Sequence, residues 1–150
     1  MAKAIKAIKA NPYQFEWPVR VYYEDTDAGG VVYHSTYLNF MERARTEWLR
    51  QLGFEQNYLK DVLNVIFVVH SMQIAFRKPA KFNEMLVITS EILKIGHGSF
   101  EFLQKISVDQ QILIEAQVKI ACLQAANFKP TAVPEKIKLA MNKYDKAERI

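Results

Sequence analysis

The segment YYEDTDAGGVVYHS, residues 22–35, joins a strand-like run to a long helical pattern and decides how the chain is organised. Three acids, a glycine pair and a histidine fall within the eleven positions 24–34. Polar groups this dense between apolar elements are costly to bury unless they are paired or used in chemistry. A glycine pair just ahead of a helix also lets the backbone come close to a bound group. We therefore predict that this segment forms the active site.

A long amphipathic helix is predicted to follow, from Ser35 to Leu52. Its bulky apolar stripe keeps the spacing of one helix face: Tyr37, Phe40, Met41, Ala44, Trp48 and Leu52. Ser35 is expected to cap its start and Gly53 to end it. On its polar side we expect two ion pairs across one turn, Glu42 with Arg45 and Arg43 with Glu47. A bulky stripe on a well-capped helix predicts a central place in the fold.

Strand patterns flank this helix. The run 17–23 alternates apolar and polar residues, which predicts a half-buried strand. Residues 54–63 are predicted to form a second short helix or an irregular segment. Four later runs are rich in Val, Ile, Phe and Leu: 65–77, 84–95, 99–109 and 111–124. The short gaps between these runs favour antiparallel hairpins. A last helix is predicted over 134–147 with Pro134 at its first position, and residues 1–16 are expected to form a flexible or peripheral segment.

This order of elements predicts an α+β fold in which an antiparallel sheet of about five strands wraps around a long central helix. A chain of 150 residues, 50% hydrophobic and 24% charged, is expected to form one domain over 1–150. The single cysteine, Cys122, lies in an apolar run, fits a reducing compartment and is predicted to be a core thiol. No apolar run approaches the roughly 20 residues that span a bilayer, so we predict a cytoplasmic protein.

The net charge of +4 suits an anionic partner such as a phosphorylated cofactor. The basic residues are dispersed and no nucleic-acid-binding signature is present, so no nucleic-acid partner is predicted. Residues 1–10, MAKAIKAIKA, are basic and weakly amphipathic. They leave two interpretations open, a frayed tail or peripheral contact with an anionic inner-membrane surface.

Several chemistries of the acidic turn are excluded by its spacing. As a calcium loop, Asp25, Asp27 and Gly30 fit the first, third and sixth positions, but Thr36 stands where a bidentate Glu is needed. No Gly-Lys-Ser/Thr follows the glycines, so the turn is not a phosphate loop. No metal is predicted, because the histidines lack ligand spacing: His34, His70 and His97. The turn is then either a plain hydrogen-bonded turn or a carboxylate beside an oxyanion-stabilising helix N-terminus.

The run Tyr23–His34, continuing through Tyr37 and Glu42–Arg45, closely resembles the hotdog-fold acyl-CoA thioesterases of the 4-hydroxybenzoyl-CoA thioesterase type. Within that family it is most similar to the bacterial thioesterases associated with the Tol–Pal envelope system. The resemblance covers residues 17–138 and its Asp-Thr-Asp motif is specific. It implies a long helix wrapped by an antiparallel sheet. It also implies hydrolysis of acyl-CoA to a free acid and coenzyme A, without a metal or redox cofactor.

The resemblance also implies residue roles. The catalytic carboxylate would be Asp27, as general base or as nucleophile. Backbone N–H groups near Tyr33 and His34 would hold the thioester oxygen, and the His34 side chain would position water or act in acid–base chemistry. Asp25 would brace the turn. Substrate-binding residues would include two in the turn and three that meet coenzyme A phosphates: Gly30, Val32, Arg77, Lys78 and Lys81.

In this family the site is built across a subunit interface, so a homodimer or homotetramer is implied, with acyl-CoA as substrate and acyl carrier protein as a further partner. An alternative function is a binding or scaffolding protein for acyl-CoA or acyl carrier protein at the bacterial envelope. A hotdog dehydratase is disfavoured, because no Gly/Pro-rich loop follows His34. Glu42 is a rival catalytic acid, although an ion pair with Arg45 is favoured. His70 is expected to be a core or interface histidine.

Overall fold

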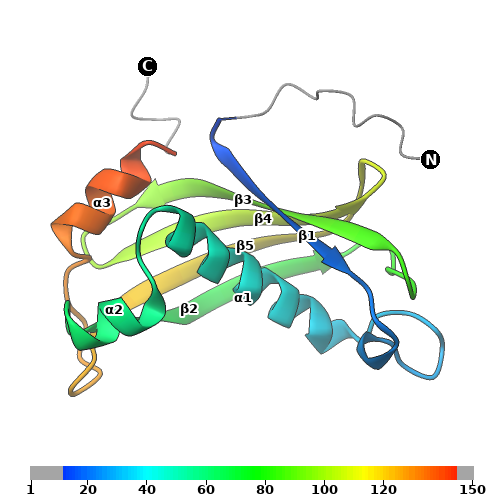
Figure 1. Cartoon of the computed structure of the whole chain (residues 1–150), viewed down its shortest axis with the longest axis horizontal. Coiled ribbons are helices and arrows are strands. Elements are labelled where there is room, and N and C mark those ends of the chain that lie inside the picture. Colours follow the sequence, from blue (N-terminus) through cyan, green and yellow to red (C-terminus); the bar gives the residue numbers. More distant parts are fainter. Residues whose placement is uncertain (1–11, 145–150) are drawn as a thin grey trace.

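The computed structural model describes residues 12–144, which form five strands and four helical segments (Figure 1). In chain order the elements are β1 (Gln14–Arg20), the 3₁₀ turn η1 (Tyr23–Asp25), α1 (His34–Gln51), α2 (Gln56–Asp61), β2 (Val65–Phe76), β3 (Met85–Ile95), β4 (Ser99–Val108), β5 (Gln111–Gln124) and α3 (Glu135–Asn142). Of the two alternatives for 54–63 the helical one is correct, as α2, and the four predicted strands from 65 onward are confirmed. The long apolar runs identified the strands, of which β3, β4 and β5 alternate buried with less buried residues, whereas β2 is mostly half-buried or exposed.

The strands form one antiparallel sheet in the order β1-β3-β4-β5-β2. The predicted hairpins are correct for β3–β4 and β4–β5. The prediction is wrong for β2 and β3, which do not pair, because β2 pairs with β5 while β1 and β4 flank β3. The connection 77–84 therefore crosses the sheet instead of turning back. This crossing brings Ala80 against the beginning of α1, which positions the site described below.

Helix α1 lies across one face of the sheet (Figure 1) and fills the core with its apolar stripe. Trp48 meets Phe102 of β4 edge to face, with ring centroids 4.9 Å apart. Helix α1 begins at His34 with Tyr33 as its N-cap, so the predicted cap at Ser35 is wrong by two residues. The extended backbone of Tyr33 (φ −65°, ψ 137°) sets that start. Gly53 directly follows the C-cap with φ +101°, which confirms it as the stop.

Two predicted boundaries need correction. Strand β1 covers 14–20 and not 17–23, because its pairing with β3 runs from Gln14–Glu91 to Arg20–Met85. Pro18 is tolerated there since β1 is an edge strand and proline has no N–H to offer a further neighbour. Residues 14–16 thus belong to the sheet and not to a peripheral segment, whereas residues 1–11 lie outside the described residues. Pro134 is the N-cap of α3 and not its first residue, and positions 145–147 of that predicted helix also lie outside.

The predicted ion pairs of α1 are replaced by other contacts. Half-buried Arg45 turns toward the sheet and donates from Nη1 to Oε1 of Gln104 at 2.9 Å, instead of pairing with Glu42. Burial lowers the pKa of Arg45. Glu47 pairs with Arg50 at 2.6 Å. Its expected partner, Arg43, instead lies over the ring of Phe40, 5.9 Å from the centroid.

Gln104 is fully buried, and its Nε2 donates to the carbonyl of Met41 at 3.1 Å and to Oγ of Ser90 at 2.9 Å. We call Arg45, Gln104 and Ser90 the buried polar cluster. Cys122 is also fully buried, as predicted, and burial raises the pKa of its thiol to about 11. Within residues 12–144 no helix is both long and apolar enough to cross a membrane.

Candidate active site

Asp25 organises the turn that precedes α1. Its carboxylate accepts the N–H of Tyr22 at 2.8 Å, and its backbone carbonyl accepts the N–H of Tyr33 at 3.0 Å. One residue therefore ties the entry of the turn to its exit. This geometry confirms the bracing role expected for Asp25, since both of its acceptors are used inside the turn.

Asp27 stands at the tip of the same turn and its side chain is exposed. Its Oδ1 accepts the N–H of Gly29 at 2.8 Å, and its backbone carbonyl accepts the N–H of Gly30 at 3.0 Å. A Cβ on Gly29 would stand 3.2 Å from that same Oδ1. Gly30 has φ +82°, a conformation that side chains disfavour. The two glycines are thus needed for different reasons, one for space beside the carboxylate and one for backbone conformation.

The start of α1 presents open backbone donors. The N–H of Tyr33 is occupied by Asp25, and the N–H of Thr36 donates to the carbonyl of Tyr33 at 2.8 Å. Among the described residues the N–H groups of His34 and Ser35 have no hydrogen-bond acceptor. First-turn N–H groups carry partial positive charge, so they suit a developing oxyanion. Of the two residues named for this role, His34 has the open donor and Tyr33 does not.

A cavity of about 270 Å³ opens beside this helix start, and these residues line it: Val32, His34, Tyr37, Phe76, Arg77, Lys78, Pro79 and Ile114. It brings together four of the predicted site residues, His34, Val32, Arg77 and Lys78. The other four predicted site residues are not among the lining residues: Asp27, Tyr33, Gly30 and Lys81. Lys81 instead donates its backbone N–H to Oε1 of Glu84 at 2.7 Å. The guanidinium of Arg77 pairs with Glu115 at 2.6 Å, whereas Lys78 is exposed at the cavity.

Tyr37 and Phe76 line the cavity but were not predicted as site residues. Their rings lie 5.9 Å apart between centroids. The hydroxyl of buried Tyr37 accepts the N–H of Ala80 at 2.9 Å, and burial raises its pKa. The apolar periodicity of α1 placed Tyr37 correctly in the core stripe. The periodicity of a helix does not indicate which distant residue a side chain contacts, and Ala80 lies 43 residues after Tyr37.

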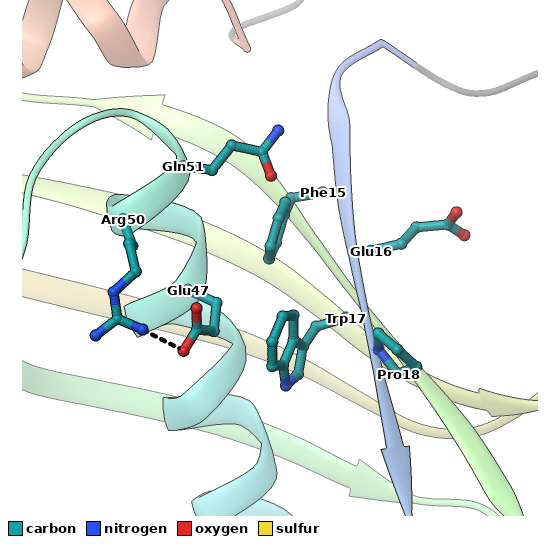
Figure 2. Close-up of a pocket in the computed structure, with 7 residues that line it drawn as sticks. All are labelled: Phe15, Glu16, Trp17, Pro18, Glu47, Arg50 and Gln51. Atoms are coloured by element: carbon teal, nitrogen blue, oxygen red, sulfur yellow. Dashed lines mark hydrogen bonds and ion pairs between the residues drawn. The ribbon is translucent and has the colours of Figure 1, made fainter.

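A larger cavity, of about 380 Å³, lies at the other end of α1 (Figure 2). Phe15 and Trp17 of β1 point into it with rings 6.4 Å apart, and Glu47 and Arg50 of α1 face them as an ion pair. Glu47 follows His34 by 13 residues, about 20 Å along the helix at 1.5 Å per residue. Because the helical carboxylate of this cavity, Glu47, is already paired with Arg50, the cavity at the start of α1 remains the candidate active site.

The remaining candidates stay apart from the site. His70 lies on β2 and His97 follows β3; both side chains are exposed, so His70 is not a core residue of this chain. Across residues 12–144 no group of three or more His, Cys, Asp or Glu side chains is placed to hold a metal ion.

The architecture, an antiparallel sheet wrapped around one long helix with a carboxylate turn at the helix start, defines a hotdog-fold domain. The family model for the thioesterase superfamily matches residues 29–118, more than half of the chain, beginning two residues after Asp27. This chain belongs to the thioesterase superfamily.

Similar sequences and a similar solved structure support this family assignment. It is 43% identical to the acyl-CoA thioesterase YbgC of Haemophilus influenzae over 128 residues, which covers 85% of this chain and 94% of that protein. It is 46% identical to the acyl-CoA thioester hydrolase YbgC of Escherichia coli, covering 85% and 95%. A probable thioesterase from Bartonella henselae superposes with a TM-score of 0.78 at 36% identity, covering 81% of this chain and 99% of that one.

Proposed function

We propose that this chain hydrolyses acyl-CoA thioesters, with the carboxylate of Asp27 as general base or nucleophile and the N–H of His34 as oxyanion donor. One observation carries the proposal. An exposed carboxylate, held by the N–H of Gly29, stands on a turn that leads directly into a helix start with open N–H groups. Acyl transfer needs this combination of a reactive group and an oxyanion site.

Either role of Asp27 gives a balanced reaction. As base, the carboxylate takes a proton from water, and the resulting hydroxide attacks the thioester carbonyl. The C–S bond then breaks, and the coenzyme A thiolate leaves and takes up a proton. As nucleophile, the carboxylate itself displaces the thiolate, and water hydrolyses the resulting mixed anhydride. Water is the final acyl acceptor in both routes, so the proposed reaction asks for no redox cofactor.

The choice of acyl-CoA rests on the names of the relatives and on the cavity wall. Apolar Val32 and Ile114 offer contact to an acyl group, while Arg77 and Lys78 offer positive charge to phosphates. Lys78 is the stronger candidate for a phosphate contact, because Arg77 already pairs with Glu115. Lys81 belongs to the same proposal as a more distant basic residue, since it is exposed on the connection that forms the cavity wall.

We also propose that the active form is a homodimer or homotetramer. Strand β2 is an edge strand of the sheet, and Val69, His70 and Phe76 on it are exposed. An unpaired edge offers hydrogen-bonding groups to another strand. Phe76 lies at the end of β2 and also lines the cavity, so a subunit placed there would reach the site. Light scattering coupled to gel filtration would report the oligomeric state directly.

The function is tested by measuring thiol release from a panel of short, long and aromatic acyl-CoAs. Asp27→Asn keeps the shape of the side chain and its acceptor for Gly29, but removes the reactive carboxylate. We expect a loss of about 10²-fold or more in kcat/KM. The matched control is Asp109→Asn at the β4–β5 turn, where φ is +48° and asparagine fits well. This control should retain wild-type rates.

Wild-type rates in Asp27→Asn would remove Asp27 from the mechanism. Acyl-CoA binding without turnover in the wild-type protein would instead support the binding or scaffolding function. A loss of less than about threefold in His34→Ala would leave only the backbone N–H of His34 in the mechanism.

A further inference from the structure

The hydroxyl of Tyr37 connects α1 to the wall of the active-site cavity. Its oxygen accepts the N–H of Ala80 at 2.9 Å. Tyr37 is buried at 3% exposure and Ala80 at 0%, so the N–H of Ala80 has little access to water as an alternative acceptor. A buried N–H without an acceptor is unfavourable, which makes the phenol oxygen a required partner for this backbone position.

Ala80 passes the contact on to the catalytic turn. Its carbonyl accepts the N–H of Val32 at 2.9 Å, and Val31 and Lys81 form an antiparallel bridge beside it. The carbonyl of Val31 in turn accepts the N–H of Asp27 at 2.9 Å. A continuous set of short hydrogen bonds and backbone links therefore runs from the side chain of Tyr37 to the backbone of Asp27.

Tyr37 is also fixed relative to the oxyanion donor. It follows His34 by three positions in α1, so both side chains lie on the same face of the helix, and both line the cavity. The proposed reaction requires a set distance between the carboxylate of Asp27 and the N–H of His34. The chain between these residues contains two glycines and cannot hold that distance by stiffness alone.

We propose that Tyr37 is a positioning residue of the thioesterase reaction, which holds the Asp27 turn at a fixed place relative to the N-terminus of α1 through Ala80 and Val32. The inference rests on the proposed function, because it assigns Tyr37 an effect only through Asp27. The charge of Asp27 contributes to raising the pKa of Tyr37, after burial and the carboxylate of Glu84.

The test is Tyr37→Phe, which removes the acceptor and retains the ring that packs against Phe76. Misplacement of reacting groups by less than 1 Å is costly in rate, so we expect kcat to fall about tenfold with KM changed less than about twofold. The matched control is Ser90→Ala, which removes another buried oxygen acceptor, the one that receives the hydrogen bond of Nε2 of Gln104. Ser90→Ala should lower the melting temperature about as much as Tyr37→Phe does, and it should leave kcat unchanged.

A double-mutant cycle separates positioning from a merely structural role. In the Asp27→Asn background, Tyr37→Phe should have no further effect on the residual rate. The same tenfold loss in both backgrounds would overturn the proposal, and so would a wild-type kcat in Tyr37→Phe alone. Failure of the proposed function is recognised independently, because Asp27→Asn would then retain activity.

One measurement needs no variant. The amide of Ala80 in the wild-type protein should exchange slowly with deuterium, because its acceptor is buried. Exchange at the rate of an unstructured peptide would overturn the hydrogen bond on which the proposal depends.

Discussion

The Asp27 turn and the buried polar cluster are both polar and both contact α1, yet they are built in opposite ways. In the cluster, fully buried Gln104 hydrogen-bonds to half-buried Arg45, to fully buried Ser90 and to the helix carbonyl of Met41. In the turn, the carboxylate of exposed Asp27 accepts one local N–H, and the turn leads into a helix start with open donors. The guanidinium of Arg45 and the carbonyl of Met41, in the middle of α1, are occupied by hydrogen bonds to Gln104. The N–H groups of His34 and Ser35, at the start of α1, have no acceptor among the described residues.

The largest expected effect on stability comes from Gln104→Met, which keeps the side-chain volume and removes every hydrogen bond of the cluster. Because the half-buried charge of Arg45 loses its acceptor, we expect the free energy of unfolding to fall by about 3 kcal/mol. Urea denaturation measures this. Gln117→Met, at an exposed position of β5, is the control and should change stability by no more than about 0.5 kcal/mol. A similar result for both variants would show that the cluster contributes little.

A smaller effect, on rate and not on stability, is expected for Gly29→Ala. The new Cβ would stand 3.2 Å from Oδ1 of Asp27, so the carboxylate must shift by a few tenths of an ångström. We expect kcat to fall about fivefold, close to 1 kcal/mol in the barrier. Gly96→Ala is the control, because its Cβ would meet the carbonyl of Ser99 at 3.3 Å in the β3–β4 turn. Equal rates in wild type and Gly29→Ala would contradict a requirement for space beside Asp27.

Burial of the Cys122 thiol makes the stability of the fold depend on pH. The pKa of Cys122 is raised to about 11, so the folded state holds the thiol proton more tightly than the unfolded state, whose pKa is near 9.0. Stability from this group is complete below pH 9 and is lost as the pH rises toward 11. Between pH 8 and pH 10 the loss should be about 1 kcal/mol. Urea denaturation at both values should show this loss in wild type and not in Cys122→Ala; parallel behaviour would contradict it.

The smallest expected effect on stability is that of Asp27→Asn. An asparagine Oδ1 still accepts the N–H of Gly29, and the side chain is exposed, so the free energy of unfolding should change by less than about 0.5 kcal/mol. Urea denaturation beside wild type checks this. A loss above about 1 kcal/mol would mean that the carboxylate also serves as a structural group, and the activity of that variant would need correction for unfolded protein.

Local patterns were sufficient for most of the fold. The apolar stripe from Tyr37 to Trp48 identified α1, and four apolar runs identified β2 to β5. Such patterns can be recognised in the sequence because a buried helix face or strand needs apolar residues at regular or continuous positions. The predicted boundaries of β1 were wrong because they depend on hydrogen-bonded pairing with β3, some 70 residues later in the chain. The ion pair of Glu42 with Arg45 failed for a similar reason, because Gln104 on a distant strand competes for the guanidinium.

The sequence by itself determined the chemical groups of the candidate site. Asp27, the glycine pair and His34 are local to one turn, and their spacing specifies a carboxylate ahead of a helix start. Only the tertiary structure decided which N–H is free, since Tyr33 is occupied by Asp25. It also placed Arg77 and Lys78 at the cavity and Ala80 against Tyr37. These contacts follow from a strand order in which β2 and β3 do not pair, and that order depends on which edges find partners across the whole sheet.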